Sequence, residues 1–212
     1  MTDKIKFSYK DQWFYTIIKP LLIFLIYFLF RPTVVGRENI PKDGPIVFAG
    51  NHTKWVDPEM ICAVVRKRQV HFLAKIELYK KLFTRIICLG MGAIPVDRKA
   101  HDGSSLKYAI NALKEGLTIG IFPEGTINRT NDVIMPFKIG AVKMAHEANA
   151  KIVPFVITGK YRLFRKGVKV EFLKPISISS DLEKENERLM KIISNKLIEG
   201  EDKNGKRKGK SL

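Results

Sequence analysis

A histidine and an aspartate lie five positions apart in the stretch NHTKWVDP, residues 51–58. His52 follows an apolar run typical of a buried strand, and Pro58 is typical of the first position of a helix. A turn between them could fold the Asp57 carboxylate onto one imidazole nitrogen and leave the other free to accept a proton. Asp57 before a proline is also typical of a helix N-cap. The pattern predicts a general base with its orienting carboxylate, or a loop that ends in a cap, and one aspartate can fill both roles.

A base of this kind needs a nucleophile to activate. The sequence contains no G-x-S-x-G motif. Cys62 and Cys88 lie in apolar, helical-looking stretches, so we interpret them as core residues in a reducing compartment. The four histidines form no ligand-spaced cluster, so no metal site is predicted, and three are interpreted as structural or surface residues: His71, His101 and His146. The lack of a protein nucleophile favours direct attack by a hydroxyl of the substrate.

Two further stretches carry groups that could bind an anion: GAIPVDR, residues 92–98, and IFPEGTINR, residues 121–129. In the second, a buried strand ends in a Pro-Glu-Gly-Thr turn, which would present backbone N–H groups, a hydroxyl and a carboxylate. Cations near the ends of successive strands could add bonds to a phosphate: Lys75, Arg98 and Arg129. Each alone would more often be a solvated surface charge, but their shared position favours a site.

Strand and helix patterns predict the framework that positions these stretches. Short apolar runs predict strands at 33–36, 45–51, 70–75, 117–123, 151–158 and 168–173. Amphipathic runs predict helices at 57–68, 78–89, 104–115, 139–148 and 182–198. This alternation predicts an α/β fold with a mixed, largely parallel sheet flanked by helices. We expect the candidate residues at the sheet edge where the strands end, the usual place for ligands in such sheets.

The N-terminal region is strongly apolar. Residues 13–30 read WFYTIIKPLLIFLIYFLF, and only Lys19 and Pro20 interrupt them. The uninterrupted part, residues 21–30, would span about 15 Å as a helix, against about 30 Å for a bilayer core. Pro20 can open a second helical segment, so we expect a bent pair of short helices inserted into one leaflet. No small-residue cleavage site follows, which argues against a signal peptide. The alternative is a helix buried in the core.

The chain is strongly basic, with a net charge of +17 over 212 residues. Such a balance implies an anionic partner: a bilayer surface, an acidic substrate or nucleic acid. Most aromatic residues lie in the N-terminal stretch or in apolar strands, which argues against nucleic acid. The length suits one domain. We predict a membrane-anchoring segment at 1–32, an α/β domain at 33–200 and a basic, disordered tail at 201–212.

Together these stretches resemble the lysophospholipid acyltransferase family, in particular its bacterial 1-acyl-sn-glycerol-3-phosphate acyltransferases (PlsC type), over roughly residues 30–175. His52 and Asp57 match the family's N-H-x4-D block. The other matching positions are Gly92, Ile94 and Arg98 (G-x-I-x-x-x-R), Phe122 to Thr126 (F-P-E-G-T), Val153-Pro154 (V-P), Lys75, and Phe137, Lys138 and Gly140 (F-K-x-G).

The resemblance implies an enzyme that moves an acyl group from an acyl carrier protein or coenzyme A thioester to the sn-2 hydroxyl of lysophosphatidic acid, giving phosphatidic acid. His52 would be the general base and Asp57 its orienting partner. The substrates would contact Lys75, Arg98, Glu124, Gly125, Thr126 and Arg129. No cofactor or metal is implied. The positive charge favours the acidic carrier protein as donor. The expected location is the cytoplasmic face of a bacterial cell membrane, monotopic or peripheral.

One position departs from the family pattern. The family usually has arginine after F-P-E-G-T, and here that residue is Ile127, whose aliphatic side chain cannot bind phosphate. Arg129 or Arg98 would have to replace it, or the head group of the acceptor differs. The same chemistry on another lysolipid or on glycerol 3-phosphate therefore stays open. A non-catalytic basic protein that binds a membrane or nucleic acid is the remaining alternative.

Overall fold

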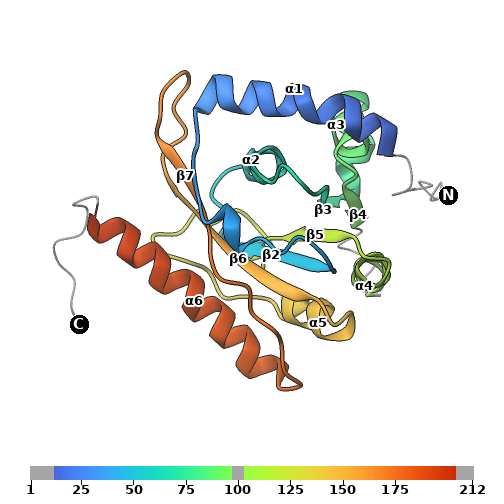
Figure 1. Ribbon diagram of the computed structural model, residues 1–212, viewed down its shortest axis with the longest axis vertical. Helices are drawn as coiled ribbons and strands as arrows, with labels where there is room; N and C mark the ends of the chain where they lie inside the picture. The colour runs from blue at the N-terminus through green and yellow to red at the C-terminus, as the bar shows by residue number, and fades with distance from the viewer. Residues whose placement is uncertain (1–11, 97–102, 204–212) are drawn as a thin grey trace.

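The computed structural model describes residues 12–96 and 103–203 (Figure 1). Its centre is a seven-stranded sheet in the order β1-β7-β6-β2-β5-β3-β4. The strands are β1 (Thr33–Val35), β2 (Ile46–Gly50), β3 (Val70–Lys75), β4 (Ile94–Val96), β5 (Thr118–Ile121), β6 (Lys151–Gly159) and β7 (Val168–Phe172). Neighbouring strands are parallel except for β6 and β7, which are antiparallel. The predicted mixed, largely parallel sheet is confirmed.

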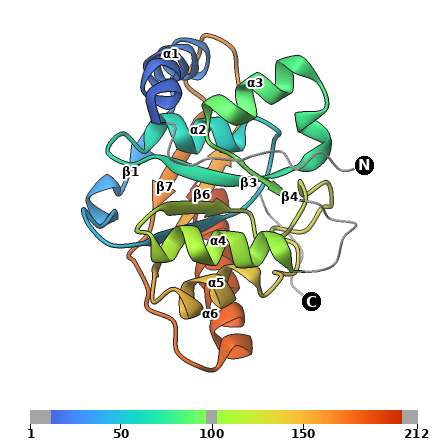
Figure 2. The same ribbon diagram turned by 90° about the vertical axis from the view of Figure 1, so that its right-hand side faces the viewer.

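Six α-helices cover the two faces of this sheet within the described residues. They are α1 (Gln12–Phe30), α2 (Asp57–Val64), α3 (Leu82–Gly90), α4 (Ser104–Lys114), α5 (Gly140–Glu147) and α6 (Leu182–Lys203), with short 3-10 turns η1 (Arg37–Asn39) and η2 (Ile76–Tyr79). Figures 1 and 2 show α1, α2 and α3 on one side of the sheet and α4, α5 and α6 on the other. The result is three layers with a core on each face.

The central strand β2 shows why both faces are covered. Its side chains alternate, so Ile46 and Phe48 enter the core beneath α1 and α2, while Val47 and Ala49 enter the core against α4, α5 and α6. All four side chains are fully buried. A strand buried on both faces reads as a continuous apolar run, which is how the sequence predicted it.

The helix α1 differs from its prediction. It runs through Pro20 as one helix, so the expected break into two segments is wrong. The residues on either side of the proline are both fastened to the domain: Tyr15 and Ile26 are buried, and Lys19 donates to two carbonyls of the loop after α2. These contacts hold the helix where the proline removes one backbone bond.

The outer side of α1 is open. Leu22, Ile23 and Ile26 pack into the core beneath it, while Ile17, Leu21, Phe24 and Phe28 are exposed. The alternative of a helix buried all round is therefore wrong. None of the described helices is both long and apolar enough to cross a bilayer.

Several element boundaries also differ. The helix predicted at 78–89 is divided into η2 and α3, because Lys81 between them has an extended backbone. The helix predicted at 57–68 ends at Val64, and the strand β4 was not predicted at all. The helix α6 continues to Lys203, so the first three residues of the predicted tail are helical. The rest of that tail lies outside the described residues, as do residues 1–11 of the predicted anchor.

Candidate active site

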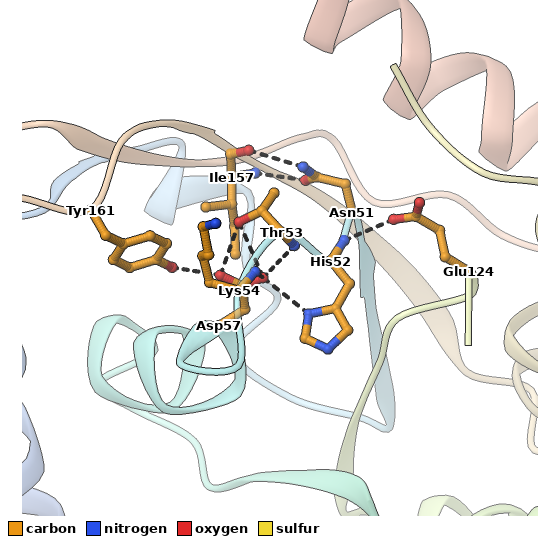
Figure 3. Close-up of polar contacts among 8 residues, drawn as sticks. All are labelled: Asn51, His52, Thr53, Lys54, Asp57, Glu124, Ile157 and Tyr161. Atoms are coloured by element: carbon orange, nitrogen blue, oxygen red, sulfur yellow. Dashed lines mark hydrogen bonds and ion pairs between the residues drawn. The ribbon is translucent and has the colours of Figure 1, made fainter. Parts of the chain in front are cut away.

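The candidate base lies where β2 leaves the sheet. Asn51 replaces the next backbone pair of β2 with its side chain: its amide donates to the carbonyl of Ile157 (2.9 Å) and accepts the N–H of Ile157 (2.8 Å). The backbone can therefore turn away at His52 without leaving β6 unpaired. His52 Nδ1 then lies 3.0 Å from Asp57 Oδ2 (Figure 3). The predicted contact between the two residues is confirmed.

Asp57 is completely buried and accepts a dense set of hydrogen bonds. Its Oδ2 accepts the backbone N–H groups of Thr53 (2.6 Å) and Lys54 (2.8 Å), and its Oδ1 accepts the hydroxyl of Tyr161 (2.6 Å). These amides precede α2, and Val56 is the N-cap residue. The prediction that Asp57 caps α2 is therefore wrong, because its carboxylate closes the preceding turn instead.

This arrangement sets the proton position on His52. An ionised carboxylate only accepts hydrogen bonds, so Nδ1 must donate to Asp57, and Nε2 then carries a free lone pair. No described residue bonds Nε2, and Figure 3 shows that edge of the ring pointing away from Asp57. A held Nδ1–H with an open Nε2 is the geometry of a general base.

The ring and backbone of His52 are fixed independently. The imidazole stacks on Phe122, with ring centroids 4.1 Å apart and planes 11° apart. The His52 N–H donates to Glu124 Oε1 (2.8 Å), and its carbonyl accepts the N–H of Asn128 (2.9 Å). The loop after β5 therefore contacts His52 at its ring, its N–H and its carbonyl.

Two glycines make room for the aromatic side chains beneath this loop. A Cβ on Gly50 would lie 2.4 Å from the ring of Phe155, and one on Gly120 would lie 2.5 Å from the ring of Phe72. Both rings contact Phe122, at centroid distances of 5.9 and 5.2 Å. Small residues at the strand ends thus support the ring on which His52 rests.

Glu124 is buried, and backbone N–H groups surround its carboxylate. It is 3% exposed, and its second oxygen accepts the N–H of Met135 (2.9 Å). Burial raises the pKa of Glu124, and the two backbone donors partly offset this. With one oxygen on the His52 N–H and the other on the Met135 N–H, Glu124 fixes the backbone at both positions.

The other predicted binding residues differ in exposure and in whether their hydrogen-bonding groups are already used. The Gly125 N–H donates to the carbonyl of Phe122, so it is used inside the turn. Thr126 and Arg129 are exposed near the end of β5, and Lys75 is exposed at the end of β3. No described residue accepts the Thr126 N–H, which leaves it available to a ligand. Arg98 lies outside the described residues.

A polar cleft opens beside His52. Its described lining comes from the loops after β2 and β5: Asn51, His52, Thr53, Glu124, Asn128, Thr130, Asn131, Asp132 and Val133. No lysine or arginine of the described residues lines it. The predicted cations Arg129 and Lys75 are therefore not part of this cleft in the structure.

Tyr161 is the site residue that the sequence did not reveal. It follows β6 and reaches Asp57 across 104 positions of sequence. Burial raises its pKa, and the Asp57 charge adds to this, so the phenol stays a donor. Its ring packs edge-on against Phe30 at the end of α1 (5.2 Å). A lone tyrosine in a basic loop carries no sequence signal for such a contact.

The cysteines and two of the three remaining histidines lie where core or surface residues were expected. Cys62 and Cys88 are buried free thiols, and burial raises the pKa of both, that of Cys88 to about 11. His71 is buried and bonds the carbonyl of Gly92 (2.7 Å), and His146 is exposed on α5. His101 lies outside the described residues. Among those described, no group of His, Cys, Asp and Glu could hold a metal.

Comparison with known proteins assigns this site to a family. A protein-family model described as "Acyltransferase" matches residues 31–158, which include the whole described site apart from Tyr161. The chain belongs to the acyltransferase family.

Relatives in this family are similar to this chain in sequence over most of its length. A 1-acyl-sn-glycerol-3-phosphate acyltransferase of Bacillus subtilis (strain 168) is 38% identical over 137 residues, covering 63% of this chain and 67% of the relative. One from Streptococcus pneumoniae (strain ATCC BAA-255 / R6) is 31% identical over 195 residues, covering 88% of this chain and 71% of the relative. Both carry the same enzyme name.

A solved acyltransferase has the same fold. The crystal structure of the 1-acyl-sn-glycerophosphate (LPA) acyltransferase PlsC from Thermotoga maritima matches with a TM-score of 0.66, covering 92% of this chain and all of that one. The sequences are 20% identical, so the likeness concerns the fold.

Proposed function

We propose that this acyltransferase transfers a fatty acyl group from a thioester to the sn-2 hydroxyl of 1-acyl-sn-glycerol 3-phosphate and so forms phosphatidic acid. The relatives named for this reaction supply the substrate class. The observation that carries the proposal is the His52–Asp57 pair, in which a buried carboxylate holds Nδ1 and Nε2 opens beside a polar cleft.

The chemistry follows from this pair. His52 Nε2 accepts the proton of the sn-2 hydroxyl as its oxygen attacks the thioester carbonyl carbon. Asp57 stabilises the imidazolium that forms. The tetrahedral oxyanion collapses, the C–S bond breaks, and the leaving thiolate takes the proton from His52. The products are an ester and a free thiol, with no covalent enzyme intermediate.

The oxyanion requires a donor near the site. The Thr126 N–H is our candidate, since the Gly125 N–H is already used within its turn. Glu124 fixes the His52 backbone and also lines the cleft beside the base.

The phosphate of the acceptor needs a cationic partner. Ile127 stands where the family usually has arginine, and no described lysine or arginine lines the cleft. We propose that Arg98 binds the phosphate, or that Arg129 binds it from outside the described lining of the cleft. Because the cleft has no described cation, a lysolipid with another head group is the second candidate acceptor.

The donor and the location are part of the same proposal. A net charge of +17 favours the acidic acyl carrier protein over coenzyme A as thioester carrier. Free, buried cysteines suit a reducing compartment, and the exposed side of α1 suits a lipid surface, so we propose the cytoplasmic face of the cell membrane.

A donor and acceptor panel tests this reaction. The purified full-length chain is incubated with acyl carrier protein or coenzyme A thioester and one of several acceptors: lysophosphatidic acid, lysophosphatidylcholine, lysophosphatidylglycerol or glycerol 3-phosphate. We expect phosphatidic acid from lysophosphatidic acid as the main product by mass spectrometry. Preference for an acceptor without a terminal phosphate would overturn the head-group assignment and leave the acyl transfer standing. Failure with every acceptor would refute the catalytic role.

A further inference from the structure

The connection between β6 and β7 ends in an unusual tip, residues 160–167 with the sequence KYRLFRKG. Leu163 and Phe164 lie at its end and are 61% and 51% exposed. Three exposed cations flank them: Arg162, Arg165 and Lys166. An exposed apolar pair among cations is typical of a segment that enters a lipid head-group region.

The backbone of the hairpin tip has a strained conformation in which Leu163 and Phe164 are exposed. Phe164 has a φ of +60°, a left-handed backbone that is uncommon for an aromatic residue. Two contacts to the end of α1 fix it there: its N–H donates to the carbonyl of Leu29, and its ring packs edge-on against Phe28 at 5.3 Å. The surrounding structure thus maintains the exposed aromatic.

The hairpin tip continues a larger apolar surface. Figures 1 and 2 show it beside the C-terminal end of α1, and Figure 1 shows α3 beside the opposite, N-terminal end of α1 on the same side of the sheet. The exposed apolar residues of α1 are Ile17, Leu21, Phe24, Leu25 and Phe28, and those of α3 are Leu82, Phe83, Ile86 and Leu89. Surfaces of this kind mark membrane or protein contacts rather than solvent-facing surface.

The same tip reaches the catalytic pair. Tyr161 donates to Asp57 and packs against Phe30 of α1, while Phe164, three residues on, packs against Phe28. We propose that the hairpin tip inserts into the head-group region of an anionic leaflet beside the exposed side of α1. Delivery of a lysolipid from that leaflet to His52 rests on the function proposed above.

Charge identifies the occupant as lipid rather than a second copy of the chain. Two hairpin tips would face each other with like charges from Arg162, Arg165 and Lys166, and the whole chain carries +17. An anionic leaflet offers the opposite charge to the cations and an apolar layer to Leu163 and Phe164. The leaflet therefore satisfies both halves of the tip at once.

The direct test uses a fluorescent label at the tip. Because Cys62 and Cys88 are buried, an environment-sensitive thiol dye will react chiefly with a new cysteine in the Leu163→Cys variant. We expect a blue shift on vesicles of phosphatidylcholine with phosphatidylglycerol, and quenching by a nitroxide lipid. The matched control is Asn195→Cys, exposed on α6 across the sheet, where the label should not respond.

Two variant series measure the contributions by vesicle sedimentation. Leu163→Ser with Phe164→Asn, a residue that tolerates the left-handed backbone, should weaken binding about tenfold or more on all vesicles. Arg162→Gln with Arg165→Gln should weaken it about tenfold on anionic vesicles and leave binding to pure phosphatidylcholine unchanged.

The readouts separate this proposal from the catalytic one. An unresponsive label at position 163 on vesicles that retain the protein would overturn the docking proposal. A blue shift that needs no vesicles and rises with protein concentration would also overturn it, in favour of a second copy. Missing acyl transfer with a fully inserted label would count against the proposed function and leave the docking intact.

Discussion

Glu59, on the first turn of α2, gives the most quantitative test of the site's surroundings. Its Oε2 is buried and has no hydrogen-bond partner in the described part of the chain. Burial raises the pKa of Glu59 from 4.5 to about 7; its own backbone N–H offsets part of this, and the nearby Asp57 carboxylate adds to it. A carboxyl group with one oxygen buried and without a hydrogen-bond partner favours its neutral form.

The sign and size of the effect follow from this pKa. The native chain keeps a proton on Glu59 that the unfolded chain releases, so the free energy of unfolding falls as the pH rises from about 4.5 to about 7. The difference corresponds to about 3 kcal/mol at full ionisation. Most of it, roughly 2–3 kcal/mol, develops between about pH 5 and about pH 8.

The Glu59→Gln variant removes the ionisation and keeps the shape. We expect it to lie within about 1 kcal/mol of the wild type at pH 5 and to be about 3 kcal/mol more stable at pH 8. Urea unfolding followed by circular dichroism across this pH range measures the difference. The control is Glu187→Gln, the same change at an exposed position of α6, whose difference from wild type should not vary with pH. Parallel pH curves for Glu59→Gln and wild type would refute the reasoning.

Three further outcomes are expected. Tyr161→Phe removes one of the bonds to Asp57, and kcat should fall about tenfold with KM nearly unchanged, because a hydrogen bond to a charged group contributes about 1.5–3 kcal/mol; steady-state kinetics measure this, and an unchanged kcat would contradict it. Glu124→Gln places an amide N–H against one of two backbone donors, so urea unfolding should show a loss of about 1–3 kcal/mol, and an equal midpoint would count against its positioning role. Rates with the acyl carrier protein thioester should fall with added salt more steeply than rates with coenzyme A, and equal slopes would remove the preference for the acidic donor.

Local contacts were predictable from the sequence. His52 and Asp57 are joined by one short turn, so their types and spacing were enough to predict that they meet. The strand β2 was predictable because it is apolar on both faces. Even here one detail failed: the sequence could not tell a carboxylate that closes the turn before α2 from one that caps the helix.

Contacts between distant parts of the chain were not predictable. Tyr161 meets Asp57 across 104 positions, and Glu124 meets the His52 N–H across 72, and neither spacing leaves a pattern in the sequence. The strand β4 was not predicted because it is only three residues long and contains a proline. The continuity of α1 through Pro20 depends on packing against α2, which no local signal records.

His52 has the proposed role of the base that activates the lipid hydroxyl. The His52→Ala variant is compared with His146→Ala, the same change at an exposed residue of α5, in single-turnover reactions with acyl thioester and lysophosphatidic acid. We predict that His52→Ala loses about a thousandfold or more in rate while it stays folded and binds vesicles like the wild type, and that His146→Ala retains wild-type rates. Wild-type rates in His52→Ala would contradict the account.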